Sequence, residues 1–283
     1  SSTAASSGDY STAASSGNSS KAASSGDYSK AASSGNSSKA ASSGHSSTAA
    51  SSGNSSKAAS SGNSSTAASS GHSSTAASSG HSSTAASSGD YSACAAVGYR
   101  AAVKGDIGNL LMASEYITKN GNYIPIGGKV DIVDGKKIKP NCWYIVESGN
   151  WVEVDFTDNI FARVISTRKG TKRVKTDNGE ILFVVNDDKG NSAHGSTIKE
   201  AFADLAFKLV SKDIDQFKNM PLDIVKTPQE WALVYRAITG SCQTGIKMFM
   251  ESKGGLKKKY SLSEILKETE GAYGYDKFVD GVS

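Results

Sequence analysis

The chain contains two kinds of hydrophobic pattern. From Ser1 to about Gly98, small residues recur with a period of nine, and the unit reads Ser-Ser-Thr-Ala-Ala-Ser-Ser-Gly-Asn, as at Ser46–Asn54. Beyond this region, large apolar residues first alternate with polar ones and later recur at helical spacing. A fixed short period is typical of repeat proteins, in which each unit packs against its neighbours. The nonapeptide therefore predicts the architecture of the first part of the chain.

Variation within the nonapeptide is almost entirely confined to three positions. With Ser1 as position one, position three is Thr or Lys, position nine is Asn, Asp or His, and position one is Ser or Tyr. Because side chains alternate along a strand, we expect positions one and three to point outward and positions two and four inward. Gly at position eight supplies the backbone conformation that a corner needs.

Nine residues are too few to close a coil around an interior, so two nonapeptides per coil is the simplest arrangement. The sequence then predicts a β-solenoid with a thin core of Ala and Ser. Equivalent residues of successive coils should stack, with parallel strands about 4.8 Å apart. The candidate surface residues that this period stacks are Tyr10 with Tyr28, and Lys21 with Lys39 and Lys57.

A flexible Ser/Gly/Ala linker is the alternative interpretation of this composition. A linker needs only a composition, whereas this segment keeps a strict order, which favours the solenoid. Small side chains bury little apolar area, so backbone hydrogen bonds between coils must provide much of the stability. The first coil leaves an open β edge, and we therefore expect a homo-oligomer that assembles through the solenoid.

Larger residues replace Ser and Ala between Tyr91 and Gly108, which predicts a cap that ends the solenoid domain at residue 108. A β-rich domain is expected over 109–195, because short apolar runs alternate with Asn-Gly, Asp-Gly and similar turns. The expected strands are Leu110–Ile117, Lys129–Val133, Trp143–Glu147, Trp151–Phe156, Phe161–Thr167, Thr171–Thr176 and Ile181–Asn186. The third and fourth should pair as a hairpin with aromatic contacts across the strands.

Residues 196–283 have helical spacing and predict a small bundle of three or four helices. The first helix begins with a capping-box sequence at Thr197, and its expected apolar stripe is Ile198, Phe202, Leu205 and Leu209. A second helix begins at Thr227 and ends at Gly240, with a stripe of Trp231, Val234, Tyr235 and Ile238. A third begins at Ser261. The fold class is therefore mainly β, a β-solenoid followed by an α+β region with a helical bundle.

Composition argues against several classes of protein. The 283 residues carry a net charge of +4, which is too small to indicate a nucleic-acid partner. Cys94, Cys142 and Cys242 are odd in number and far apart, so no disulfide framework is indicated and a cytoplasmic location is the simpler expectation. No apolar run approaches the length of a membrane span, and we expect no membrane association.

One segment carries a cluster of basic residues. The strands expected around residue 168 contain Arg163, Arg168, Lys169, Lys172, Arg173 and Lys175. These residues could hold the phosphates of a nucleotide-like ligand, and a solvated charged hairpin is the alternative. His194, between the expected sheet and the first helix, is a further candidate ligand contact.

Cys242 follows the end of one expected helix and could begin the next, and the pKa of a thiol can be lowered at a helix N-terminus. Together with His194 it could provide nucleophilic catalysis, but a buried Cys and a loop His are the alternative, and we expect no catalytic residue. His45, His72 and His81 occupy variable repeat positions and should be surface residues rather than metal ligands. The glycine clusters match no phosphate-binding loop, so no metal and no cofactor are expected.

Four segments of the chain carry a resemblance to known proteins. Nonapeptide copies such as Tyr10–Asn18, together with Val133–Tyr144, Asn191–Thr197 and Tyr235–Cys242, resemble nonapeptide-repeat proteins encoded by phages, prophages and gut bacteria. The resemblance implies an origin in a phage or mobile element and carries no established activity. The nine-residue spacing is also similar to calcium-binding RTX repeats, but the Asp ligand is present in few repeats and the Gly pair is missing.

The resemblance and the residues together suggest a non-enzymatic accessory protein of a phage or prophage. In this interpretation the solenoid serves assembly, and the C-terminal region binds a host protein or a small ligand and interferes with host defence. The protein would then act in the cytoplasm of the infected or lysogenic bacterium, with a virion or surface location as the alternative. A structural or adhesive surface fibre is the first alternative function. A hydrolase or transferase that uses Cys242 and His194 is the second.

Overall fold

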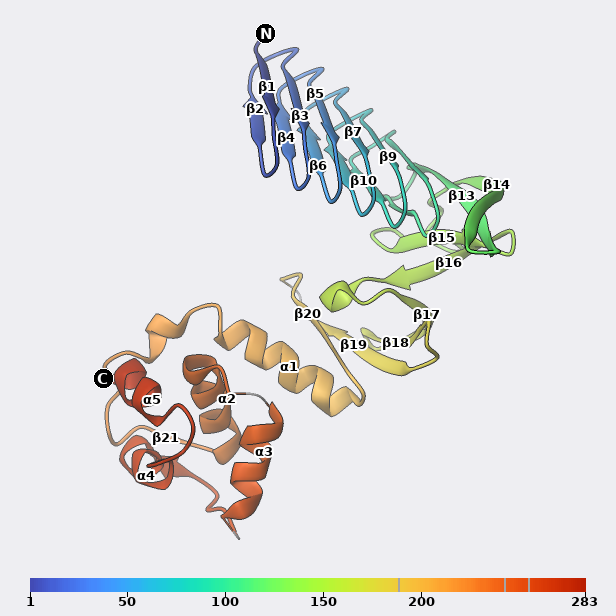
Figure 1. Ribbon diagram of the computed structural model, residues 1–283. Helices are drawn as coiled ribbons and strands as arrows, with labels where there is room; N and C mark the ends of the chain where they lie inside the picture. Colours follow the sequence, from blue (N-terminus) through green and yellow to red (C-terminus); the bar gives the residue numbers. More distant parts are fainter. Residues whose placement is uncertain (188, 242, 254) are drawn as a thin grey trace. The chain divides into compact units, whose positions relative to one another are not determined.

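The structure is a computed structural model that describes residues 1–187, 189–241, 243–253 and 255–283. The chain divides into two compact units, Ser1–Asp155 and Phe156–Ser283, which are described separately (Figure 1). Strands dominate the first unit, and the helices lie toward the C-terminus. The expected fold class is therefore confirmed, while the expected domain boundaries near residues 108 and 195 stay predictions.

Each nonapeptide forms one short strand of a two-sheet solenoid (Figure 1). The strands are β1 (Thr3–Ser7), β2 (Thr12–Ser15), β3 (Lys21–Ser25), β4 (Lys30–Ser34), β5 (Lys39–Ser43), β6 (Thr48–Ser52), β7 (Lys57–Ser61), β8 (Thr66–Ser70), β9 (Thr75–Ser79), β10 (Thr84–Ser88), β11 (Ala93–Val97) and β12 (Ala102–Lys104). Odd-numbered strands form one parallel sheet and even-numbered strands the other. Thr3 pairs with Lys21 and Thr12 with Lys30, which confirms two nonapeptides per coil.

Positions two, four and six of the repeat point into the solenoid. The position-four residues Ala49, Ala67 and Ala85 are fully buried, and so is Ser38 at position two. The Ser38 hydroxyl donates to the Ser52 carbonyl at 2.9 Å, so this polar side chain keeps a hydrogen bond inside the core. The expected inward direction of positions two and four is confirmed.

Position one belongs to a corner and not to a strand. The strands cover positions three to seven, and positions eight, nine and one turn the chain, so the expected alternation does not extend to position one. Tyr10, Ser19 and Tyr28 at this position have left-handed φ values of 59°, 59° and 57°. Gly is required at position eight because a Cβ on Gly26 would lie 2.4 Å from the carbonyl oxygen of Gly8 in the preceding coil.

Larger residues continue the core beyond the last repeat. The strand β13 (Leu110–Lys119) pairs in parallel with β11, and β14 (Asn122–Ile132) pairs antiparallel with β13. The strand β15 (Trp143–Glu147) pairs antiparallel with β12 and with β16 (Asn150–Asp155). The core side chains of this cap include Cys94, Val103, Leu111, Val133, Ile138 and Tyr144. The Tyr144 and Trp151 rings meet edge to face at 6.4 Å, which confirms the expected aromatic hairpin.

The strand expected over Lys129–Val133 begins earlier, at Asn122. Pro125 and two glycines obscured its first half in the sequence. The structure accommodates these residues through a register shift opposite Glu115 and Tyr116.

The second unit begins with a short 3-10 helix, η1 (Thr157–Asn159), and an antiparallel sheet. Its strands are β17 (Ala162–Arg168), β18 (Thr171–Thr176), β19 (Ile181–Asn186) and β20 (Ser192–Gly195), each paired with the next. The helix α1 (Ile198–Val210) packs on β19 and β20.

The apolar stripe expected for α1 is correct only at Leu205. Ile198, Phe202 and Leu209 are exposed, and the buried residues are Ala201 and Leu205. The physical reason is a close approach to β20, because a Cβ on Gly195 would lie 2.4 Å from the backbone nitrogen of Ala201. Only small residues allow this approach. The Thr197 hydroxyl does accept a hydrogen bond from the Glu200 N–H, as expected for the cap.

The rest of the second unit is a helical bundle. Its elements are η2 (Ile214–Phe217), β21 (Val225–Lys226), α2 (Pro228–Thr239), α3 (Gln243–Ser252), β22 (Tyr260–Ser261), α4 (Leu262–Glu268) and α5 (Tyr275–Val282). The expected capping boxes at Thr227 and Ser261 are both present, and Gly240 ends α2 with a φ of 74°. The described residues contain five α-helices rather than three or four. The additional helix α5 begins at Gly274 without a side-chain cap, so it had no start signal.

Candidate ligand-binding site

The basic residues of the β17–β18 hairpin do not form one cluster. Lys172 pairs with Val184, which in turn pairs with His194, and directly opposite residues share a face of the sheet. Arg173 points to the other face, where it is opposite Phe183. The sheet therefore brings Lys172 and His194 to one face and Arg173 to the other.

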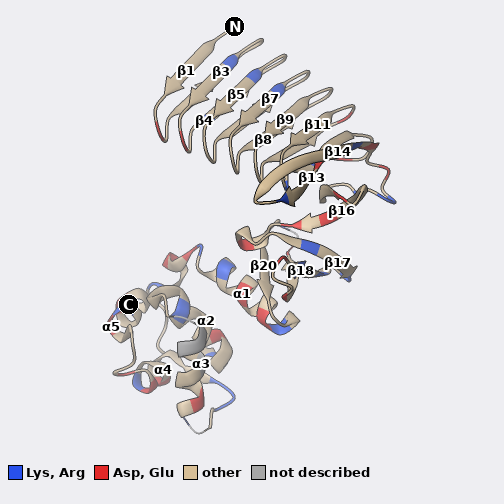
Figure 2. Cartoon of the chain, turned by 45° about the vertical axis from the view of Figure 1, so that its right-hand side comes forward, with Lys and Arg blue, Asp and Glu red and all other residues tan. Residues whose placement is uncertain are grey.

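The remaining basic residues divide between the face that carries Arg173 and the turn of the hairpin. Arg163 pairs with Lys175 on the same face as Arg173. Its guanidinium forms an ion pair with Asp177 at 2.6 Å, which neutralises its charge. Arg168 and Lys169 lie at the exposed turn, where Figure 2 colours the end of β17 blue. Their role in ligand binding stays a prediction.

His194 belongs to a small network of charges. Its Nδ1 atom lies 2.5 Å from Asp158 Oδ2, and Lys208 of α1 pairs with the other oxygen of the same carboxylate. Lys208 also donates to the Ser192 carbonyl at 2.8 Å. Burial raises the pKa of Asp158, but the hydrogen bonds and charges of Lys208 and His194 outweigh it and hold that pKa below its usual value. The network connects η1, β20 and α1.

The structure describes two of the three cysteines, and these two differ in burial. Burial raises the pKa of the Cys94 thiol to about 11, so Cys94 is a protonated core residue whose sulfur donates to the Lys104 carbonyl at 3.2 Å. Cys142 is partly buried against the solenoid core. Cys242 lies outside the described residues, so its expected pairing with His194 stays a prediction.

The solenoid carries the expected stacks of exposed side chains. The Tyr10 and Tyr28 rings are parallel within 5°, with centroids 5.1 Å apart, which confirms their stacking. Lys21, Lys39 and Lys57 pair in successive coils, and Figure 2 shows them as blue segments at one level of β3, β5 and β7.

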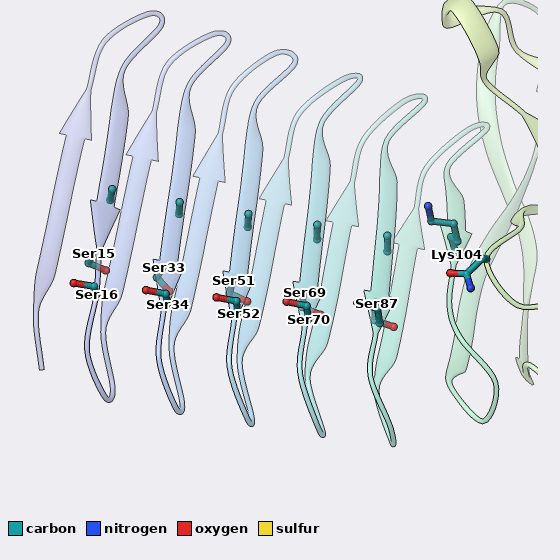
Figure 3. Close-up of a pocket in the computed structure, with 17 residues that line it drawn as sticks. Ser15, Ser16, Ser33, Ser34, Ser51, Ser52, Ser69, Ser70, Ser87 and Lys104 are labelled. Carbon is teal, nitrogen blue, oxygen red and sulfur yellow. The ribbon is translucent and has the colours of Figure 1, made fainter. Parts of the chain in front are cut away.

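A shallow groove runs along each sheet of the solenoid. Figure 3 shows one of them, on the even-numbered sheet, with Ser16, Ser34, Ser52 and Ser70 in a row. The groove is lined by Ala and Ser, apart from Lys104 and Asn141 at one end. A second groove of the same kind lies on the odd-numbered sheet. Both offer small, uniform side chains and little to orient a ligand.

The helical bundle contains a deeper and more apolar pocket of about 590 Å³. It lies among α2, α3 and α4, and its lining residues are Pro228, Trp231, Ala232, Tyr235, Gly240, Ser241, Ile246, Phe249, Met250, Lys253, Leu256, Tyr260, Ile265, Glu268, Thr269, Ala272 and Tyr273. Pockets of 300–1,000 Å³ with mainly apolar and aromatic walls are typical of small-molecule sites. The volume and the mainly apolar lining of this pocket both match that description.

Two polar side-chain groups in the pocket wall donate hydrogen bonds to backbone carbonyls of the protein. The Trp231 indole donates to the Tyr260 carbonyl at 2.8 Å. The Tyr235 hydroxyl donates to the Tyr273 carbonyl at 2.9 Å. The wall therefore meets a ligand mainly with carbon atoms and ring faces.

One ion pair lies at the edge of the pocket. Lys253 Nζ is 3.2 Å from Glu268 Oε2 and donates to the Glu268 carbonyl at 2.7 Å. The same ammonium lies 4.9 Å from the centre of the Phe249 ring. This pair is partly exposed, so it marks the side of the pocket that contacts water.

Sequence reasoning did not find this pocket. The stripe of α2 correctly placed Trp231 and Tyr235 on the inner face, but such a stripe is equally typical of a filled core. Phe249 and Met250 come from α3, for which the sequence offered only Cys242 as a possible start. The pocket depends on how these helices pack, which no local pattern reports.

Comparison with known proteins gives no relative for this chain. No protein-family profile, no curated protein and no solved structure matches it. No helix among the described residues is long and apolar enough to cross a membrane. Functional inference therefore depends on the site itself.

Proposed function

We propose that this chain is a non-enzymatic binding protein whose helical bundle takes up an apolar small molecule. The observation that carries the proposal is the pocket of about 590 Å³ among α2, α3 and α4. Burial of a ligand's apolar surface there would supply the affinity, at about 25 cal/mol per Å² before the costs of binding.

The chemistry of the wall supports a ligand with an apolar body and one polar end. Trp231, Phe249 and Tyr260 line the pocket and offer aromatic carbon atoms to an aliphatic or aromatic body. Lys253 and Glu268 at the edge offer the charged groups that a polar end would meet. A fatty acid of medium chain length has this chemistry.

Two methionines of α3 provide a matched test of the pocket. Met250 lines the pocket, whereas Met248, two residues away, is 65% exposed and is not among the lining residues. A Met250→Trp substitution should fill the pocket and weaken the binding of anilinonaphthalene sulfonate by about tenfold or more, which is about 1.4 kcal/mol. A Met248→Trp substitution should leave the affinity unchanged.

The measurement is a fluorescence titration of the full chain, with circular dichroism melting as the check of folding. Comparison of the two variants removes any contribution of the dye at other apolar surfaces, because both retain them. Equal affinities in both folded variants would contradict the pocket as the site.

The biological setting that we propose rests on the resemblance described above. We propose that the protein is a phage- or prophage-encoded accessory protein, with the solenoid as its assembly part. Interference with host defence is the purpose that this setting suggests. The alternative of a hydrolase or transferase depends on Cys242, which lies outside the described residues.

A further inference from the structure

The strand β14 lies at one end of the sheet that contains the odd-numbered solenoid strands, and its outer edge is unpaired. Among the described strands, β14 pairs only with β13 (Figure 1). Val133 donates its N–H to the Asn109 carbonyl at 3.0 Å and accepts from the Gly108 N–H at 2.9 Å, so its backbone groups face β13. Alternation along the strand then directs the N–H and C=O groups of Gly128, Val130 and Ile132 to the unpaired side.

Only part of this edge is blocked against another strand. Pro125, which lacks an N–H, and the register shift opposite Glu115 and Tyr116 interrupt the first half of β14. Register is continuous from Gly128 to Ile132. Natural edge strands use such features to prevent pairing, and in β14 they are confined to the first half of the strand.

The second half of β14, from Gly128 to Ile132, carries an exposed apolar face. Val130 is opposite Met112 and Ile132 is opposite Leu110, so the four side chains share one face of the sheet. Val130 and Ile132 are 52% and 55% exposed, and Met112 and Leu110 are 43% and 39% exposed. Pairing of this edge with a second strand of the same kind would bring Val130 and Ile132 into contact with its apolar side chains on this face.

We propose that β14 pairs antiparallel with β14 of a second copy of this chain, with Val130 opposite Val130 at the twofold axis. In this register Lys129 of each copy is opposite Asp131 of the other, so the contact contains two pairs of opposite charges. The outward N–H and C=O groups of Gly128, Val130 and Ile132 join the two sheets. The apolar faces of the two copies then form one continuous surface.

Charge selects this register over its neighbours. A shift to either adjacent hydrogen-bonded register places Lys129 opposite Lys129, or Asp131 opposite Asp131, and like charges directly opposite are destabilising. Lys129 at present donates to the Gly149 carbonyl at 3.0 Å, and Asp131 accepts from the Trp151 indole at 3.3 Å. An ammonium has three protons and a carboxylate several lone pairs, so each retains capacity for the second copy.

A charge swap in the full chain tests the proposal. Sedimentation equilibrium should give the unmodified chain a mass twice the 29.2 kDa of one chain. Lys129→Asp or Asp131→Lys alone creates two like-charge pairs and should raise the dimer dissociation constant by about tenfold or more. The double substitution exchanges the two charges, restores both opposite pairs and should restore the dimer.

A second pair of variants tests the backbone contact. Val130→Pro removes an outward N–H that β13 does not use, so the monomer should fold and the dimer should be lost. Val130→Thr keeps the N–H and the β-branched shape and should still dimerise. A monomeric parent chain, or an oligomer that all these folded variants leave unchanged, would overturn the proposal.

Discussion

At the scale of single residues, the solenoid depends on how its buried serine hydroxyls are satisfied. Several position-two serines donate to carbonyls of the following nonapeptide, as Ser20 does to Ser34 at 2.8 Å, whereas the buried Ser83 hydroxyl has no hydrogen-bond partner. Among the described residues, the position-six hydroxyls of Ser24, Ser51 and Ser69 are buried without a hydrogen-bond partner. An unmade hydrogen bond of a buried group costs free energy. The core is therefore stabilised chiefly by backbone ladders and alanine packing.

A single carboxylate should make the second unit sensitive to acid. The pKa of Asp158 is below its usual value in the folded protein, so its ionised form stabilises the fold above the usual carboxyl pKa. This contribution is lost as the pH falls through the lowered pKa of the folded state. Asp158→Asn should therefore reduce the free energy of unfolding at neutral pH, and the difference from the parent should shrink in acid.

Urea unfolding of both proteins across the acid range measures this difference. Because protonated Asp158 resembles Asn, the two curves should converge at the lowest pH. A difference that is equal at neutral and acidic pH would show that the Asp158 carboxylate is not the cause.

At the scale of elements, the corners set the spacing of the coils. Gly53 has a φ of 113°, and a Cβ there would lie 2.5 Å from the Gly35 carbonyl oxygen. Gly17 has a similar φ of 105°, but no atom lies within 4 Å of the position of its Cβ. A substitution at Gly17 therefore tests backbone strain alone, whereas a substitution at Gly53 tests backbone strain together with a clash between coils.

Alanine substitutions at these two corners should differ in their effect. Both Gly17→Ala and Gly53→Ala incur the left-handed backbone penalty, on the order of 1–2 kcal/mol. Gly53→Ala also forces neighbouring coils apart and should lower the thermal unfolding midpoint further than Gly17→Ala. Equal midpoints for the two variants would contradict the close stacking of the corners.

Comparison of single elements with their sequences explains why some predictions were correct and others were not. The nonapeptide predicted two strands per coil because the same local rule repeats many times. The stripe expected for α1 was correct only at Leu205, because Gly195 and Ala201 set the packing of this helix, and a close approach of two backbones produces no hydrophobic period. Helix α5 was missed because Gly274 is its N-cap, without a side-chain signal.

At the scale of the whole molecule, the chain combines a repetitive β unit with a unit that contains an apolar pocket. The basic residues around β17 are adjacent in sequence, but the pairing of Lys172 with Val184 and of Arg173 with Phe183 separates them onto two faces. The pocket residues come from several helices whose patterns are each typical of core. The sequence therefore predicted the architecture well, and the candidate site required the three-dimensional packing.

The most direct test of the account is a methyl NMR titration of the full chain with decanoate. The four methionines include Met250 in the pocket, Met248 on the exposed side of α3 and Met112 on the β13–β14 face. We predict a saturable shift of the Met250 methyl resonance, with those of Met248 and Met112 unchanged. No shift of Met250, or equal shifts of all three, would contradict a ligand pocket in the helical bundle.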